Sequence, residues 1–268
     1  AFRLRVHGLD IRIRHQQGAA KGGGGWTYVG PDVHYDEGGS GDKVSKHSNV
    51  YTIDRSLSDP NVLFCGTESG GVYRSTDQAQ HWDHVSQDHI IGAVSAIRIH
   101  PADPNTVLFS AENELWRSTD GGATWAVIGD PVFQALNISA WELAFDPSDP
   151  NTVLAACNLG LFRSTDGGDT WSEVLANECM TIAYKPNDPA TVYTIQFEPA
   201  LNISRFYKST DAGLTWTMYD NGWFTPPAGE TGLYAIEGGR LAVTAADPDR
   251  IYAVLVGYQQ AGASITTN

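Results

Sequence analysis

Apolar and basic residues alternate one by one at the start of the chain. The apolar positions are Phe2, Leu4, Val6, Ile11 and Ile13, and arginine or histidine stands between most of them. A period of two is typical of a half-exposed β-strand, and it predicts a strand pair folded around residues 8–10. The basic extension 1–22 is then either an edge hairpin with a solvated face or a surface that docks on acidic groups of this chain or a partner.

Farther along, the apolar residues come in short runs between turn-forming residues. Runs such as 95–99, 107–109 and 115–117 have the length and the side chains of short strands. An Asp-Pro phrase recurs between such runs, at Asp59-Pro60, Asp103-Pro104, Asp149-Pro150, Asp188-Pro189 and Asp247-Pro248. Proline presets the φ angle of a tight turn, so each phrase predicts a turn that joins two antiparallel strands.

A second phrase, Ser-Thr-Asp-Gly-Gly-x-Thr-Trp, recurs in step with the first. It starts at Ser118, Ser164 and, with Ala for the first Gly, Ser209; a degenerate copy starts at Ser75, and the four starts are 43, 46 and 45 residues apart. Short Ser and Asp side chains accept hydrogen bonds from the backbone just ahead of them, and glycine permits a tight bend. Each phrase therefore predicts a rigid corner, which we call a Ser/Asp corner, before a strand that begins with Trp. The structural residues predicted for the four corners are Ser75, Asp77, Trp82, Ser118, Asp120, Gly122, Trp125, Ser164, Asp166, Gly168, Trp171, Ser209, Asp211, Gly213 and Trp216.

This double repeat predicts the fold. A four-stranded meander that returns about every 45 residues indicates an all-β protein, a β-propeller of four-stranded antiparallel blades. Four full blades are expected near residues 48–86, 93–129, 139–175 and 179–219. Partial blades are expected at both ends, with 26–29 as a closing strand and a fifth blade that begins at Arg240 and stops after its second strand. The region 23–268 is interpreted as a fragment of a propeller with six to ten blades or more.

These phrases resemble the Asp-box, or BNR, repeat of sialidases, of xyloglucanase-type glycoside hydrolases and of the sortilin (VPS10) propeller. The resemblance covers residues 26–257, and its closest pattern is that of large secreted proteins from bacteria with type IX secretion. In these families the corner is structural, so the resemblance implies a fold and a secreted or cell-surface location rather than an activity. Arg74, Arg117 and Arg163 precede the corners at matching positions, and they are predicted to be part of the blade architecture rather than a substrate-binding arginine cluster.

Charge and composition narrow the class of partner. The net charge of −14 argues against a general affinity for the phosphates of nucleic acids. No apolar run approaches the roughly 20 residues needed to span a membrane. The first residues lack the order of a signal peptide, so a mature or trimmed N-terminus is expected.

The chain has three cysteines, Cys65, Cys157 and Cys179, and they have no metal-ligand spacing. They are either buried small side chains or include a Cys157–Cys179 bridge.

One face of the predicted propeller carries the candidate ligand-binding residues. In related propellers, ligands bind the face formed by the loops between second and third strands and by the loops between blades. Residues expected on this face are Glu112, Glu198, Trp223, Phe224 and Tyr234. The three aromatic residues belong to a long loop, 219–239. Their rings suit stacking on a sugar or gripping a peptide, or else they cover the core or meet a neighbouring domain.

The loop 31–42 is the candidate metal site. Asp32, Asp36, Glu37 and Asp42 supply the oxygen ligands that Ca²⁺ prefers, and glycines separate some of them. The loop lacks the fixed spacing of an established calcium-binding loop, and a solvated acidic loop is the alternative. No other cofactor is predicted.

The segment 65–74 carries the candidate catalytic residue. It is similar to the Thr-Asp-x-Gly-Gly-x-Tyr-Arg segment of xyloglucanase-type hydrolases, and this resemblance implies that Glu68 matches their catalytic aspartate. Glycoside hydrolysis normally uses two carboxylates, and in that family the second one comes from another propeller. The alternative is a Gly-Gly bend with an exposed glutamate.

The complete set of structural repeats, without a complete catalytic constellation, favours a binding role. The leading hypothesis is a non-catalytic extracellular propeller that binds or scaffolds a glycan or protein ligand within a larger secreted or cell-surface protein. One alternative is a glycoside hydrolase or polysaccharide-processing domain that resembles xyloglucanases. A second alternative is peptide binding of the sortilin kind. Further domains of the same polypeptide are expected as partners, without nucleic acid and without a membrane span.

Overall fold

The computed structural model describes residues 3–6, 9–12, 49–89, 91–129, 131–220, 223 and 234–259. These residues form four four-stranded antiparallel sheets and two strand pairs. The first two sheets contain β3 (Val50–Arg55), β4 (Leu63–Thr67), β5 (Val72–Ser75) and β6 (Asp83–His84), then β7 (Val94–His100), β8 (Asp103–Ala111), β9 (Glu114–Ser118) and β10 (Ala126–Ile128). The next two contain β11 (Ala140–Phe145), β12 (Val153–Cys157), β13 (Gly160–Ser164) and β14 (Ser172–Ala176), then β15 (Cys179–Lys185), β16 (Asp188–Glu198), β17 (Ile203–Ser209) and β18 (Thr217–Tyr219).

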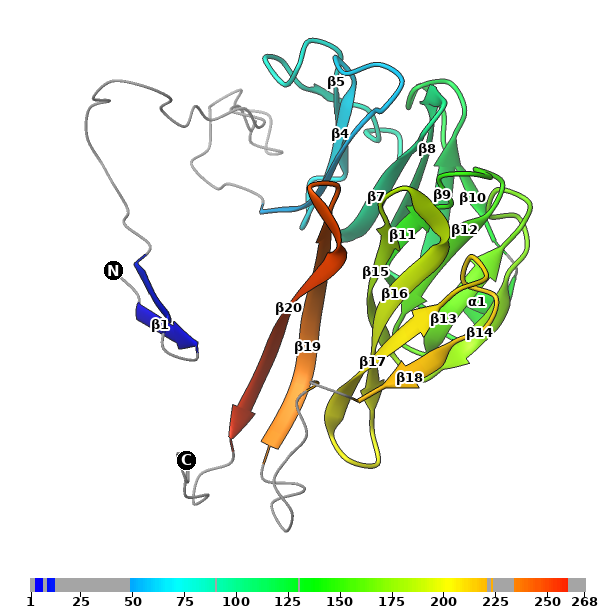
Figure 1. Cartoon of the computed structure of the whole chain (residues 1–268). Helices are drawn as coiled ribbons and strands as arrows, with labels where there is room; N and C mark the ends of the chain where they lie inside the picture. The colour runs from blue at the N-terminus through cyan, green and yellow to red at the C-terminus, as the bar shows by residue number, and fades with distance from the viewer. Residues whose placement is uncertain are drawn as a thin grey trace.

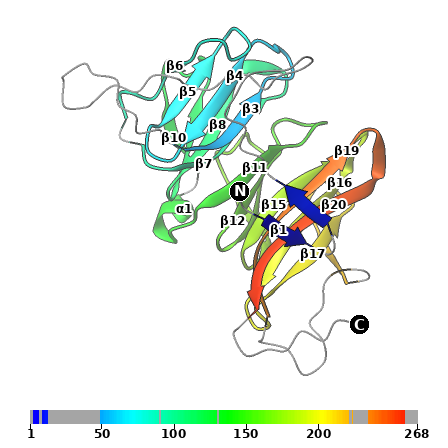
Figure 2. The ribbon, with the colours of Figure 1, turned by 90° about the vertical axis from the view of Figure 1, so that its left-hand side faces the viewer.

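The two strand pairs lie at either end of the described sequence. One consists of β1 (Arg3–Val6) and β2 (Leu9–Arg12), and the other of β19 (Tyr234–Thr244) and β20 (Asp247–Gln259). Figures 1 and 2 show the sheets following one another in chain order, from the cyan first sheet to the orange and red pair. This arrangement is the partial propeller of four-stranded blades that the repeat predicts.

Three details differ from the sequence prediction. The fifth blade begins at Tyr234 rather than Arg240, because β19 pairs with β20 along nearly its whole length. Leu9 and Asp10, expected in a turn, belong to β2 and pair with β1. A short helix, α1 (Pro131–Ala135), lies in the connection between the second and third blades, where only a loop was expected. The expected closing strand, 26–29, lies outside the described residues.

The hydrophobic core lies between successive blades. In β12 every residue is buried, since alternate side chains point to opposite faces of the sheet and each face meets a neighbouring blade. Val153 and Ala155 pack toward the second blade, whereas Leu154 and Ala156 pack toward the fourth. A strand buried on both faces has no polar side, and for this reason it reads as a continuous apolar run.

The corner tryptophans close these interfaces. Trp125 is 8% exposed, and its ring lies 4.8 Å from that of Phe109 and 6.5 Å from that of Phe64 in the first blade. Its indole Nε1 donates to the carbonyl of Val85, 2.8 Å away, and so joins two blades directly. Trp171 and Trp216 pack against the next two cores.

One hydrogen-bond pattern fixes all four Ser/Asp corners. The hydroxyl of Ser118 donates to Oδ1 of Asp120 (2.8 Å) and accepts from the N–H of Gly122 (2.8 Å). The carboxylate of Asp120 accepts from the N–H (2.9 Å) and the hydroxyl (2.6 Å) of Thr124. The other three corners repeat this pattern, with His81 in place of threonine in the first. All bonds are local, and this is why the turn can be read from the sequence.

These hydrogen bonds stabilise the charged form of the corner aspartates. They lower the pKa to about 2 at Asp77, Asp120 and Asp166. The largest contribution comes from the residue four positions later, through the hydroxyl at Asp120 and Asp166 and through the backbone N–H at Asp77. At Asp211 partial burial acts in the opposite direction, and the hydrogen bonds still leave its pKa lowered.

A stability change at acid pH follows from these pKa values. A carboxyl whose pKa is lower in the folded than in the unfolded state adds stability above its unfolded pKa, and this stability is lost as the pH falls toward the folded value. We expect the difference in melting temperature between the natural chain and Asp120→Asn to be largest above pH 4 and to shrink between about pH 4 and about pH 2. Scanning calorimetry across this range measures it. A difference that stays constant with pH would contradict the proposed role of the carboxylate.

Arginine side chains tie the second, third and fourth corners to the blade before each of them. Nη1 of Arg117 lies 2.9 Å from Oδ1 of Asp169, and Nε of Arg163 donates to the carbonyl of Ala212 at 3.2 Å. Arg74 closely approaches the corner of the second blade in the same way. The arginines that precede the corners therefore belong to the blade architecture.

Candidate binding site at the channel mouth

A β-bulge recurs near the start of each innermost strand. It falls between Val50 and Thr52 in β3, and at the matching positions of β7, β11, β15 and β19. Innermost strands of successive blades contact one another around the axis. A bulge turns one extra side chain out of the regular alternation, so the bulges at this end of the blades present Tyr51, Ser95 and Trp141 together.

A cavity of about 350 Å³ opens at this end, which we call the channel mouth. It lies on the face predicted to bind ligands, because the inner strands start there and the loops between second and third strands reach it. Aromatic, charged and hydroxyl side chains line it: Tyr51, Trp141, Glu112, Arg240, Ser95 and Ser139. Tyr51 is 51% exposed and Trp141 is 39% exposed, and they come from the first and third blades. They therefore flank the second blade, which contributes Ser95 and Glu112.

Glu68 is exposed beside the mouth and is not among the residues that line the cavity. Its Oε2 accepts a hydrogen bond of 2.7 Å from Nδ2 of Asn49, and its backbone N–H donates to the carbonyl of Asn49 at 2.8 Å. A further hydrogen bond joins the carboxylate to the hydroxyl of Tyr51, and it raises the pKa of Tyr51. Through its hydrogen bonds to Asn49 and Tyr51, Glu68 holds a wall of the cavity in place.

Glu112 presents its carboxylate to the cavity. It occupies the left-handed backbone region, with φ of 54°, at the tip of the connection between β8 and β9. Its Oε1 lies directly over Gly92, where an added Cβ would come within 2.4 Å of it. Among the described residues, no hydrogen bond or ion pair to this carboxylate is found.

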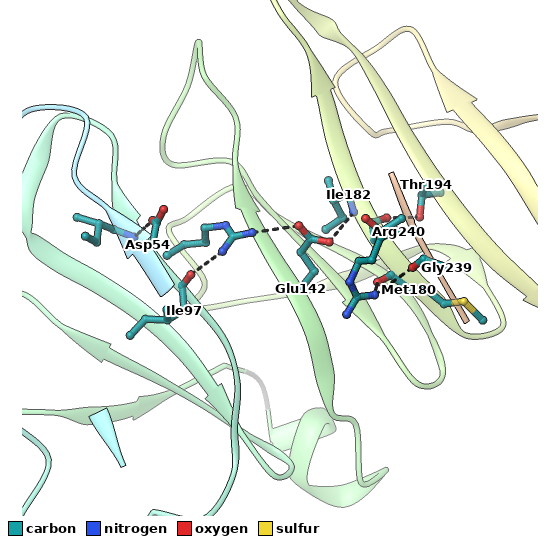
Figure 3. Close-up of polar contacts among 11 residues, drawn as sticks. Asp54, Ile97, Glu142, Met180, Ile182, Thr194, Gly239 and Arg240 are labelled. Atoms are coloured by element: carbon teal, nitrogen blue, oxygen red, sulfur yellow. Dashed lines mark hydrogen bonds and ion pairs between the residues drawn. The ribbon is translucent and has the colours of Figure 1, made fainter. Parts of the chain in front are cut away.

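A line of polar contacts joins the innermost strands behind the mouth (Figure 3). Asp54 of β3 accepts from the N–H of Ile99 in β7 at 2.8 Å, and burial raises the pKa of this carboxyl. Glu142 of β11 accepts from Nη2 of Arg98 in β7 at 3.0 Å and from the N–H of Ile182 in β15 at 3.2 Å. The inner strands are thus linked by side chains as well as by apolar packing.

Arg240 completes this line at the fifth blade. Its Nη1 donates to the carbonyls of Met180 in β15 (2.5 Å) and of Gly239 (3.1 Å). The guanidinium is thereby held against the fourth blade while it borders the cavity. Its first role is to position β19.

Trp223 and Glu198 are not among the residues that line this cavity. Trp223 donates from Nε1 to the carbonyl of Ser204 at 2.9 Å, and its ring lies 5.5 Å from that of Phe206, so it covers the fourth blade. Glu198 ends β16 and accepts a local hydrogen bond from the N–H of Ala200. Tyr234 was expected in the loop 219–239, but it is the first residue of strand β19.

Some predicted residues are not described. Phe224 and the calcium candidates Asp32, Asp36, Glu37 and Asp42 lie outside the described residues. Within the described part of the chain, no group of three His, Cys, Asp or Glu residues is arranged to hold a metal ion. Cys65, Cys157 and Cys179 are buried free thiols, and burial raises the pKa of Cys65 and of Cys179 to about 12.

Calcium binding by the loop 31–42 stays a prediction with a direct test. If its four carboxylates hold the ion, millimolar Ca²⁺ should raise the melting temperature, because a ligand that binds the folded state stabilises it. Asp36→Asn should abolish this rise, whereas Asp220→Asn, an acidic residue outside the loop, should not. Equal melting temperatures with calcium and with chelator would rule out the site.

The sequence analysis missed Tyr51, Trp141 and Arg240. All three lie in predicted strands, where a period of two assigns side chains to a sheet face. The bulges that turn out Tyr51 and Trp141 leave no mark in that pattern, and Arg240 pairs in regular register with Val254. The sequence did carry one signal for the contacts between inner strands. Residues that pair across these strands are separated by about one repeat, as in Asp54–Ile99 and Arg98–Glu142.

Comparison with known proteins agrees with this architecture. The family model described as Sortilin, neurotensin receptor 3 (Sortilin-Vps10) matches residues 70–201, just under half of the chain. No curated protein sequence matches. The described residues contain no helix with the length and hydrophobicity that a membrane crossing requires.

Several solved structures share the fold. The GH74 xyloglucanase from Xanthomonas campestris aligns with 16% identity and a TM-score of 0.60, over 79% of this chain and 36% of that one. The Dos1 propeller aligns with 14% identity and a TM-score of 0.51, over 70% and 50%. YCF48 bound to D1 peptide aligns with 12% identity and a TM-score of 0.50, over 78% and 67%. The chain spans between 27% and 36% of the length of the GH74 enzymes that it matches. These likenesses show a β-propeller fold, and the matching segment 70–201 is similar to the Sortilin-Vps10 model.

Proposed function

We propose that this chain is a non-catalytic propeller module that binds or scaffolds an extracellular glycan or protein ligand, within a larger secreted or cell-surface protein. The channel mouth carries the proposal. It places two exposed aromatic rings, two opposite charges and two hydroxyls around one cavity, and this mixture of apolar wall and few polar groups is typical of ligand sites.

The state of Glu68 supports binding over hydrolysis. Its carboxylate accepts from Asn49 and is hydrogen-bonded to Tyr51, so it serves the wall of the cavity. A hydrolase needs a second carboxylate on the other side of the scissile bond. One of the similar propellers is a xyloglucanase and another is described with a bound peptide, so both ligand classes belong in the test.

The extracellular setting rests on the resemblance to secreted Asp-box proteins. Its test is the location of the natural full-length protein, detected by antibody in the culture medium, on intact cells and in lysed cells. A protein found only after lysis would remove this part of the proposal.

Binding is tested with immobilised glycans and a peptide panel, using the natural chain and two variants. Trp141→Ala should lose the interaction, whereas Tyr219→Ala, which removes an aromatic residue of similar exposure from the outermost strand β18, should keep it. Absence of Trp141-dependent binding to both panels would contradict the proposal. If the natural chain releases reducing sugar from β-glucan and Glu68→Gln does not, the chain is a glycoside hydrolase and the proposal of a non-catalytic module is wrong.

A further inference from the structure

We infer that the channel mouth takes a basic peptide segment, with a lysine or arginine side chain entering beside Tyr51 and Trp141 to meet the carboxylate of Glu112. This inference rests on the proposed function and names the ligand class of the same cavity.

The carboxylate of Glu112 is the feature of the cavity that points to a cationic group. Glu112 has no ion-pair partner among the described residues, although it lines a cavity with two aromatic side chains. An aromatic face attracts a cation, and a carboxylate forms a charge-assisted hydrogen bond with it, so the two kinds of group act together on lysine or arginine. The hydroxyls of a neutral sugar can also donate to this exposed carboxylate, but they do not balance its charge.

The cation that lines the cavity does not neutralise this carboxylate. Nη1 of Arg240 is engaged by the carbonyls of Met180 and Gly239, which hold the guanidinium toward β15. No ion pair between Arg240 and Glu112 is found in the described structure. We assign Arg240 to positioning the fifth blade and Glu112 to the ligand.

The size of the cavity and the charge of the chain favour the same ligand. A volume of about 350 Å³ is at the lower end of the range for ligand pockets and suits one or two long side chains. The net charge of −14 attracts basic partners over long distances and raises their association rate. An extended peptide can place one basic side chain in the mouth while its backbone lies across the face.

The test uses short Gly/Ser peptides with central Lys or Arg residues, matched peptides with norleucine or Glu, and neutral β-glucan oligosaccharides. We expect the natural chain to bind the basic peptides, and Glu112→Gln to weaken this binding by about tenfold or more. Glu114→Gln makes the same charge change two residues away, where the carboxylate accepts from Gln134, and should change the affinity by less than about twofold.

Two further variants separate charge from position. Gly92→Ala should push the carboxylate of Glu112 aside and weaken binding with the charge retained, and Glu112→Asp should keep part of the affinity. Added salt should weaken binding by the natural chain more than by Glu112→Gln. Melting curves confirm that each variant is folded.

The outcomes distinguish this inference from the proposed function. Basic-peptide binding that is unchanged in Glu112→Gln would overturn the inference. Trp141-dependent binding of oligosaccharides without binding of basic peptides would overturn it too, while the proposed function would stand. Absence of Trp141-dependent binding to every probe would overturn both.

Discussion

Trp125→Ala should lower the free energy of unfolding by about 3–5 kcal/mol, the usual cost of removing a large buried aromatic side chain. Trp125 fills the interface between the first two blades, where its ring meets Phe64 and Phe109 and its N–H reaches the carbonyl of Val85. The alanine leaves both a cavity and an unpaired carbonyl. Urea unfolding followed by far-UV circular dichroism measures the change.

Trp216→Ala is the matched control for this prediction. Trp216 occupies the same position of the repeat, but it is only partly buried and donates to Gly213 within its own corner, so it makes no polar bond between blades. Its loss should cost less than that of Trp125. Trp125→Phe should recover most of the stability, with a residual loss of about 1 kcal/mol for the missing hydrogen bond. Equal losses in the free energy of unfolding for the two alanine variants would show that Trp125 contributes no more to stability than Trp216 does.

The corners and the blades could be predicted from the sequence because their interactions are local. Ser118, Asp120 and Thr124 lie within seven positions of one another, and their hydrogen bonds depend only on the backbone of one turn. The strand runs between corners show their burial directly, since a strand such as β12 packs against a blade on each face. Fold class therefore follows from short phrases and their spacing.

The channel mouth was only partly predictable. Glu112 was expected on the ligand face because loop residues follow from the strand order. Tyr51 and Trp141 were not expected, because a bulge depends on how adjacent strands twist and pair across a sheet. Covering the core was one of two alternatives for Trp223, and the sequence did not choose between them because Ser204 and Phe206 lie almost 20 residues earlier in the chain. Long aromatic side chains in loops can fold back on a blade, and composition alone does not separate this from exposure.

Glu142→Ala is the second prediction with a large effect, and we expect a loss of about 2–3 kcal/mol. The side chain of Glu142 is 18% exposed and pairs with Arg98, which is 28% exposed. It also accepts from the N–H of Ile182, so its removal leaves a partly buried cation and a backbone donor without their acceptor. Glu142→Gln should lose less, because the amide oxygen can still accept one of these bonds.

The control and the coupling test use the same unfolding measurement. Glu173→Ala removes an exposed glutamate from the outer strand β14 and should change stability by less than about 0.5 kcal/mol. A double-mutant cycle of Arg98→Ala with Glu142→Ala isolates the ion pair, and a coupling energy near zero would contradict its role in stability.

Because Glu142 follows the bulge residue Trp141, its loss should also weaken ligand binding at the channel mouth, whereas Glu173→Ala should not. The same residue then determines both how the third blade is joined to its neighbours and where its aromatic side chain meets the ligand.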